Sequence, residues 1–422
     1  MIKYSDSKAA NEKWEALAEA AGTDTASAMK ELYSLYDADL VLWLASLYEP
    51  RYGGFYFSAS ARDNDVCVHS DREYRLLPDV ESTCQALGII NASGMLSGRA
   101  ENYSGFLPEK MKKQIADAIY GMQDPDGYFY HEQWGKDIGI SRRARDLAWS
   151  RSILSTLGRE MKYPSILSSG EKQSSETLIP DHLSSKAKFI EYLDSLNLTE
   201  NCYPAGNNLS AQSIQIKSVG LMDTCIEYLS EKQNPKTGLW HSVPDYYAVN
   251  GLMKISGVYN SAGKPLPHSR EAALAAIDAI CSDTPIRAVV DLWNTWVAVG
   301  RITENLERFG GVDGAREAEE IRSILRKNAA PAIRKSLDKL RPFKREMSSF
   351  SYLFNRMCTH SQGAPVAPAE PFVGDLNATM IASTHMVGSI FDALGLRDYS
   401  ISLYGSDEAD AFLEAINKKL NM

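Results

Sequence analysis

One local pattern recurs along this chain and limits the fold more than any other feature. In its first copy, Tyr52-Gly53-Gly54-Phe55-Tyr56 is followed, after a polar loop, by the stretch Leu77 to Ile90. Paired glycines permit a tight turn, and the aromatic residues after them favour a short strand. Asp79 then suits the N-cap of a helix and Glu81 its first turn, where acidic groups complement the helix dipole. The pattern predicts a turn that connects one helix to the next.

Three later segments repeat parts of this unit. Gln123 to His131 and Gln233 to His241 each hold a glutamine, a proline two residues on, a glycine with an aromatic residue two positions after it, and a histidine eight residues after the glutamine. Ser348 to Tyr352 is a degenerate copy in which serines replace the glycines. Most of the sequence between these segments has the periodicity of helices.

Pairing the helix before each connecting loop with the helix after it predicts six hairpins. Their second members are expected to begin near Asp79, Arg142, Asn208, Asp245, Pro285 and Asp375. Amphipathic hairpins that cannot bury their apolar faces alone stack on their neighbours. We therefore expect an all-α fold, an (α/α)6 toroid with short strands or turns in its loops and the second members as the inner ring. One domain would span residues 1–422, with an N-terminal arm at 1–24 and a surface loop at 164–181.

A family resemblance agrees with this expectation. Gly53-Gly54-Phe55 followed by Asp79-x-x-x-Thr83-x-x-Ala86-Leu87 resembles the repeat of the terpenoid cyclase and protein prenyltransferase toroids. In those proteins, Gln-rich and Gly-Gly-aromatic turns precede inner helices with acidic starts, and Gln123 to His131 and Gln233 to Trp240 look similar. The resemblance runs from about Leu40 to Gly395 and implies the toroid fold much more than a reaction.

The catalytic motifs of that family are missing from the sequence. The nearest match to an Asp-x-Asp-Asp acid motif is Asp37-Ala38-Asp39-Leu40, which lies inside a predicted helix, and no Asp-Asp-x-x-Asp motif occurs. Asp65, Cys67 and His69 would share one face of a strand, and all three residue types can bind zinc, but an exposed hairpin explains them equally well. We predict no metal and no cofactor, and terpenoid or prenyl chemistry stays an alternative.

Charge and composition exclude other classes of protein. The 422-residue chain has a formal charge of −9, which argues against a nucleic-acid binder with a basic face. No apolar run approaches the roughly 18 residues that span a bilayer, and the first residues have no apolar signal region. The six cysteines are scattered without a CxxC pair, which is typical of free thiols in a reducing compartment. We expect a cytoplasmic protein with no membrane partner.

Inner helices of a toroid would place their leading residues at one mouth of a cavity. The residues expected there are polar and aromatic, which suits a small-molecule or oligosaccharide ligand better than a terpenoid. The candidate catalytic residues are Asp79, Asp146, His241, Asp245 and Tyr246. The candidate substrate-binding residues are Tyr56, Tyr128, His131, Arg145, Asn208, Trp240, Asn250, Asp375 and Asn377. Each single Asp can equally be a helix N-cap with a structural role only.

Two carbohydrate chemistries fit this set. A glycoside hydrolase would use two carboxylates, Asp79 or Glu81 with Asp146 or Asp245, as proton donor and as base or nucleophile. A polysaccharide lyase would abstract a proton beside a sugar carboxylate with His241 or Tyr246, while Asn250 and Arg145 neutralise that carboxylate. A toroid that binds a glycan or peptide without turning it over is a further alternative. Asp291, Trp293, Asn294 and Trp296, and also His385, are expected to be buried structural residues.

Overall fold

The computed structural model describes residues 3–64, 66–69, 71–168, 174–368 and 373–422. The chain is mostly helical, which confirms the predicted all-α class. Its strands form short antiparallel pairs: β1 (Tyr48–Glu49) with β2 (Gly54–Phe55), β3 (Val66–His69) with β4 (Arg72–Arg75), and β5 (His360–Ser361) with β6 (Ala364–Pro365). Over the described ranges, no helix is both long enough and apolar enough to cross a membrane.

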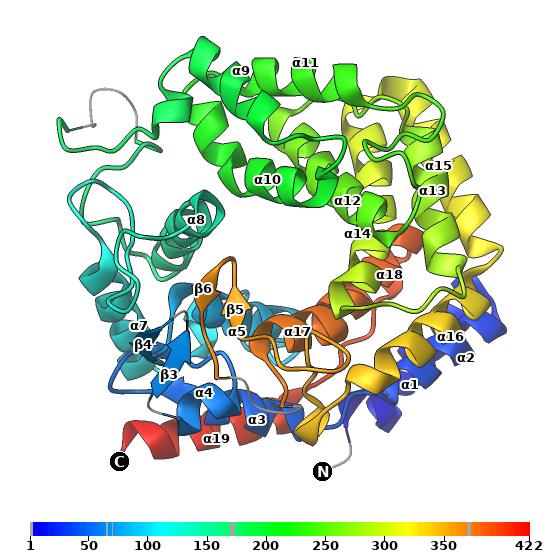
Figure 1. Ribbon diagram of the computed structural model, residues 1–422. Helices are drawn as coiled ribbons and strands as arrows, with labels where there is room; N and C mark the ends of the chain where they lie inside the picture. The colour runs from blue at the N-terminus through cyan, green and yellow to red at the C-terminus, as the bar shows by residue number, and fades with distance from the viewer. Residues whose placement is uncertain (1–2, 65, 70, 169–173, 369–372) are drawn as a thin grey trace.

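A series of helices follow one another in chain order around a common centre (Figure 1). They are α5 (Val80–Ala92), α8 (Ile140–Thr156), α10 (Cys202–Ser218), α12 (Tyr246–Ala262), α14 (Val289–Phe309), and α17 (Leu376–Met380), which continues through the π-helical turn η6 (Ile381–His385) into α18 (Met386–Leu394). Each contacts the next, and α17 returns to contact α5, so the series closes on itself. We call these the inner helices.

The remaining helices lie mostly outside this series. The longer ones are α1 (Lys8–Ala21), α2 (Thr23–Tyr33), α7 (Glu109–Met122), α9 (Lys186–Ser195), α11 (Met222–Lys232), α13 (Ser269–Cys281), α15 (Gly311–Arg326), α16 (Ala329–Leu340) and α19 (Ser406–Leu420). The shorter ones are η1 (Tyr4–Asp6), α3 (Leu40–Ser46), α4 (Ala59–Asp63), α6 (Tyr103–Phe106), η3 (Asp181–Leu183), η4 (Arg341–Phe343), η5 (Glu346–Ser348) and η7 (Arg397–Tyr399). Residues 3–24 pack through the buried Trp14 and Leu17, and α1 contacts α2.

The Gly-Gly-Phe turn and its serine copy are built in the same way. Asp79 caps α5 and Asp375 caps α17, each accepting backbone N–H groups of the first turn. The threonine four residues after each Asp then holds the aromatic turn: Phe55 N donates to Thr83 Oγ1 at 3.1 Å, and Phe350 N donates to Thr379 Oγ1 at 2.9 Å. Each acidic cap therefore positions a helix start and the turn before it.

The glutamines of the other two copies also hold backbone. Gln123 Oε1 accepts from Lys162 N at 2.7 Å, and its Nε2 donates to Tyr163 O at 2.9 Å. Gln233 Nε2 donates to Gly238 O at 2.8 Å. Both side chains are buried, so these segments serve to fix turns.

Three predicted boundaries are wrong. α10 begins at Cys202, because Pro204 is tolerated within a first helical turn, so Asn208 lies inside the helix and not at its start. α14 begins at Val289 and not at Pro285, because Asp291 Oδ2 accepts from Ala288 N at 3.1 Å and caps the helix there. The charged residues 314–340, whose periodicity predicts one long helix, are instead divided between α15 and α16 at Asn328.

Gly53→Ala is expected to lower the free energy of unfolding by roughly 2 kcal/mol or more. Gly53 has φ +64°, and an added Cβ would lie 2.1 Å from the Gln114 carbonyl oxygen. Gly98→Ala is the matched control, because Gly98 has φ +71° with no atom within 4 Å of the added Cβ. The control should lose only the roughly 1 kcal/mol cost of the backbone conformation. Urea unfolding of both variants measures the difference, and equal losses would contradict the close approach.

Candidate functional site

Three carboxylates surround one buried guanidinium at the first turns of α5 and α8. Arg142 donates from Nη2 to Asp79 Oδ1 at 2.7 Å, from Nη1 to Glu81 Oε2 at 2.9 Å, and from Nε to Asp146 Oδ2 at 3.0 Å. The Arg142 side chain is 1% exposed, and none of its three partners exceeds 3%. We call these four residues the Arg142 cluster; it joins α5 to α8.

Charge in the Arg142 cluster is unbalanced, and the pKa values of its acids diverge. Burial raises the pKa of Asp146 to about 7, and the negative charges of Asp79 and Glu81 act in the same direction. Burial acts on Asp79 as well, but Arg142 and the Ser82 hydroxyl hold the pKa of Asp79 below its usual value. Three acids facing one cation favour the retention of one proton near neutral pH, and Asp146 retains it.

His131 supports this cluster from one side. Its ring stacks on Trp134 with centroids 4.1 Å apart, and the Arg142 guanidinium lies 5.1 Å from the Trp134 ring centroid. His131 Nδ1 accepts from Gln133 N at 3.1 Å, which leaves Nε2–H to donate to Pro78 O at 3.3 Å. Burial lowers the pKa of His131, so the neutral ring is the stable form. His131, which was predicted to bind a ligand, is 4% exposed and packs against Trp134 beside the cluster.

A second polar group lies deeper along the inner helices. Arg145 and Trp149 are one turn apart on α8, Lys254 follows Asn250 by one turn on α12, and Arg301 belongs to α14. Arg145 and Arg301 are close enough to Lys254 for their charges to act on it. All four of the charged and aromatic side chains, Arg145, Trp149, Lys254 and Arg301, keep partial solvent access. We call Arg145, Lys254 and Arg301 the cationic group.

Lys254 is the unusual member of the cationic group. Burial lowers its pKa well below the usual value, and the charges of Arg145 and Arg301 lower it further. Within the part of the chain that the structure describes, its amine forms no hydrogen bond or ion pair. Arg301, in contrast, donates from Nη1 to Met253 O at 2.9 Å. This environment favours the neutral amine of Lys254 over its ammonium form.

Sequence reasoning did not find Lys254, Trp149 or Arg301. Trp149 follows Arg145 by four residues, Lys254 follows Asn250 by four, and Arg301 follows Asn294 by seven. Residues at these spacings share one face of a helix, and that periodicity was the available signal. His385 and Trp293, expected to be buried, are both partly accessible, and their ring centroids lie 6.1 Å apart. His385 ends the π-helical turn η6, a distortion that is frequent at functional sites. Burial lowers the pKa of His385 to about 4.

Polar side chains link the inner helices around these groups. Asn250 donates from Nδ2 to Asp291 Oδ1 at 2.9 Å and accepts from Asn294 Nδ2 at 2.8 Å, which ties α12 to α14. Arg145 donates to the Asn207 amide oxygen on α10 and stacks over Trp149, 5.6 Å from its ring centroid. Asn250 and Arg145 therefore lie where the sequence placed them, on the inner helices, although Asn250 is only 3% exposed.

Two of the predicted aromatic ligand platforms are packed within apolar side chains. Trp240 is 3% exposed, belongs to the main hydrophobic core, and donates from Nε1 to Leu229 O at 2.8 Å on α11. Tyr56 is 6% exposed in a smaller apolar cluster with Phe57 and Trp134. Neither presents a ring to a ligand, because each is covered by the apolar side chains of its own cluster.

His241, Asp245 and Tyr246 also lie away from the Arg142 cluster. Asp245 is exposed and accepts from Ala248 N at 3.0 Å as the N-cap of α12, and His241 contacts Val243 and Tyr247. Tyr246 points outward: its hydroxyl donates to Ala279 O at 3.1 Å and accepts from Lys339 Nζ at 2.7 Å. Tyr246, one of the two expected bases, therefore bonds to α13 and α16.

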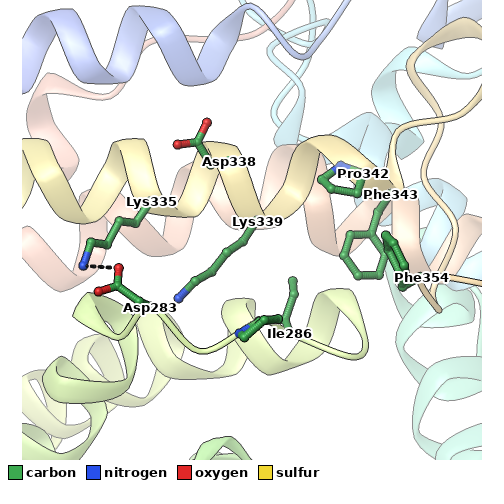
Figure 2. Close-up of a pocket in the computed structure, with 9 residues that line it drawn as sticks. Asp283, Ile286, Lys335, Asp338, Lys339, Pro342, Phe343 and Phe354 are labelled. Atoms are coloured by element: carbon green, nitrogen blue, oxygen red, sulfur yellow. Dashed lines mark ion pairs between the residues drawn. The ribbon is translucent and has the colours of Figure 1, made fainter.

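Lys339 lines a cavity of about 380 Å³ between the α13–α14 connection and α16 (Figure 2). Lys335 pairs with Asp283 at 2.7 Å on its rim, and Ile286, Phe343 and Phe354 form its apolar wall. Lys339 also donates to Ser282 O at 2.5 Å. Both lysines therefore already bind neighbouring groups. None of the residues of the cationic group lines this cavity.

The remaining predicted residues are partly structural. Asp375 is fully buried, accepts from Ala378 N at 2.7 Å and from Tyr352 N at 2.9 Å, and burial raises its pKa to about 7. Asn377 follows it in the first turn of α17 and is partly accessible. Asn208 lies on α10, where its carbonyl accepts from Gln212 Nε2 at 3.1 Å. Tyr128 lies on the outer side of α8 beside Arg143.

The zinc alternative is tested only in part. Asp65 and the side chain of His69 lie outside the described residues, and Cys67 lies on β3. Among the side chains that are described, no group of three His, Cys, Asp or Glu residues is placed to hold a metal ion.

No protein-family model, no curated protein and no solved structure matches this chain. Its function is therefore argued from the geometry of its own residues.

Arg142→Met is expected to destabilise the fold by about 3–5 kcal/mol, because it leaves Asp79, Glu81 and Asp146 buried without their cation. Arg151→Met, on the exposed side of the same helix, is the control and should change stability by no more than about 0.5 kcal/mol. Chemical denaturation at neutral pH compares the two. A loss below about 1 kcal/mol for Arg142→Met would show that the cluster does not hold the fold together.

Asp375→Asn is expected to change how stability depends on pH. The folded pKa of Asp375 is raised to about 7, whereas an unfolded Asp titrates near pH 4. Between these values the folded state binds the additional proton, so the carboxyl's contribution is present at low pH and is lost as pH rises, at up to about 1.4 kcal/mol per pH unit. Unfolding free energies measured from pH 4.5 to 7.5 should therefore fall more steeply for the wild type than for the variant. Parallel curves would contradict the buried, protonated carboxyl.

Proposed function

We propose that the protein is a carbohydrate-active enzyme of the polysaccharide lyase type, built as an (α/α)6 toroid whose inner helices enclose the substrate site. The closed series of inner helices, with helices packed outside it, supports the toroid. The observation that carries the function is the cationic group: the charges of Arg145 and Arg301, from two inner helices, act on Lys254 of a third, and each of the three side chains keeps partial solvent access. A concentration of positive charge in an acidic protein favours an anionic ligand.

The chemistry of the group favours elimination over hydrolysis. In a lyase reaction on a uronate sugar, a base removes the proton beside the carboxylate, and the bond from the ring to the leaving oxygen then breaks. The lowered pKa of Lys254 favours the uncharged amine that a base needs, and Arg145 or Arg301 can neutralise the sugar carboxylate. Burial raises the pKa of Tyr203, which interacts with Arg145, so this phenol keeps a proton that it can give to the leaving oxygen. The products are an unsaturated sugar and a new hydroxyl end.

A hydrolase is less well supported because its carboxylates are not accessible. Asp79, Glu81 and Asp146 are at most 2% exposed and are bound to Arg142. Asp245 is an exposed cap on another helix. A hydrolytic pair would need two carboxylates on either side of one bond.

A panel of oligosaccharides tests this proposal. Acidic oligosaccharides that contain uronates should give products with the ultraviolet absorbance of an unsaturated sugar. New reducing ends without this absorbance would identify a hydrolase instead. Saturable binding of the same oligosaccharides without any product would identify a glycan-binding protein, and turnover of an isoprenoid diphosphate would support the terpenoid alternative.

Lys254→Met is expected to reduce kcat/KM on the acidic oligosaccharide by about 100-fold or more, because it removes the base and keeps the volume of the side chain. Stability should hold or rise, since a buried amine without a partner is removed. Lys264→Met is the matched control, because Lys264 lies just past the same helix and makes only a surface pair with Asp223 at 3.5 Å. The control should keep wild-type turnover. Full activity in Lys254→Met would exclude this lysine as the base.

A further inference from the structure

Arg143 differs from both of its arginine neighbours on α8. Arg142 is bound by three carboxylates, and Arg145 contacts Glu81 and Asn207. Among the described residues, no carboxylate or hydrogen-bond acceptor is paired with the Arg143 guanidinium. Its Nε atom is nevertheless buried. A buried guanidinium N–H without an acceptor is costly, and such a group needs an explanation.

Tyr128 adds a second donor of the same kind. The residue is 1% exposed, and its buried hydroxyl has no hydrogen-bond partner. The Arg143 guanidinium carbon lies 6.0 Å from the centroid of the Tyr128 ring. Burial raises the pKa of Tyr128, so the phenol keeps its proton and remains a donor at neutral pH. Two unpartnered donors are therefore placed beside each other.

Both side chains line the same cavity, which has a volume of about 220 Å³. Its other walls come from α10, from η3 and from the segment just before η3. The lining includes Ile140, Leu178, Pro180, His182, Gln212 and Gln215. The volume is suited to a small ion or a single ligand group and is too small for a sugar chain.

The charges around the cavity leave Arg143 without a counterion. The Asp126 carboxylate forms an ion pair with Lys136, with Oδ2 and Nζ 3.2 Å apart, and the Asp181 carboxylate forms one with Lys188. His182 Nε2 donates to Gln212 Oε1 at 2.7 Å, because the Gln212 amide nitrogen donates to Tyr192 and to Asn208. Burial lowers the pKa of His182, so this histidine adds no positive charge. Among the described residues that line the cavity, Arg143 therefore carries the one charge that is not neutralised.

We propose that this cavity binds a small oxyanion, in the form of a phosphate, sulfate or carboxylate group, through the Arg143 guanidinium and the Tyr128 hydroxyl. A guanidinium binds such groups with two parallel N–H donors, and a phenol adds a third. The site goes beyond the proposed function and does not depend on it. Arg143 is two residues from Arg145, about 200° around the helix, so it faces away from the cationic group.

Titration calorimetry with inorganic phosphate, sulfate and acetate tests the site, at constant ionic strength maintained with sodium chloride. The wild type should bind at least one of the three with a saturable 1:1 isotherm, and the ranking identifies the kind of anion. Arg143→Met should weaken that binding at least tenfold. Arg151→Met removes an exposed arginine from the same helix and should bind like the wild type. Equal affinity in Arg143→Met and wild type, or no saturable binding of any of the three anions, would overturn the proposal.

Tyr128→Phe gives an independent readout. Without the anion, the variant should melt at the same temperature as the wild type or higher, because it removes a buried hydroxyl that has no partner. With the anion, its rise in melting temperature should be smaller than that of the wild type. If the anion raises the melting temperature of Tyr128→Phe as much as that of the wild type, the hydroxyl is not part of the site. If the variant instead melts at a lower temperature than the wild type in anion-free buffer, the hydroxyl has a structural partner and is not an unpartnered donor.

Discussion

The ion-pair network around Arg142 is the constraint on which the polar interior depends. A guanidinium that is 1% exposed is stable in the protein only because Asp79, Glu81 and Asp146 share it. Asp79 and Glu81 belong to the start of α5, whereas Arg142 and Asp146 belong to α8. The network therefore fixes the position of one helix relative to the next. It also positions Arg145, one turn along α8, whose charge acts on Lys254.

The ends of the inner series depend on a second set of contacts between distant parts of the chain. Leu376 N donates to Phe57 O at 2.9 Å, and Ser58 pairs with Asp375 as an isolated β-bridge. These bonds join the turn before α5 to the start of α17, which follows it by about three hundred residues. The first and last copies of the repeated unit are therefore neighbours, and their acidic caps lie on adjacent helices.

Local signals in the sequence predicted much of the helical framework. The caps Asp79, Asp245 and Asp375 begin their helices as expected, because an N-cap needs only the backbone of its own first turn. The signal failed at Asn208 and at Pro285, which were expected near helix starts, because α10 begins at Cys202 and α14 at Val289, where the neighbouring residues decide the helix start. It also failed for Trp240 and Tyr246, because the direction in which a turn's side chains point depends on the helix that packs against them.

The sequence by itself determined the class of fold and the acidic helix starts, because helix periodicity and N-caps depend on interactions between residues close together in the chain. Only the tertiary structure decided which polar groups share an environment. Arg142, Arg143 and Arg145 look alike in the sequence, yet successive positions on a helix point about 100° apart. One of these arginines is therefore neutralised by three acids, one faces an unpaired tyrosine, and one faces a buried lysine. Their different surroundings, which come from α5, α10 and α12, separate a structural arginine from the two for which we propose ligands.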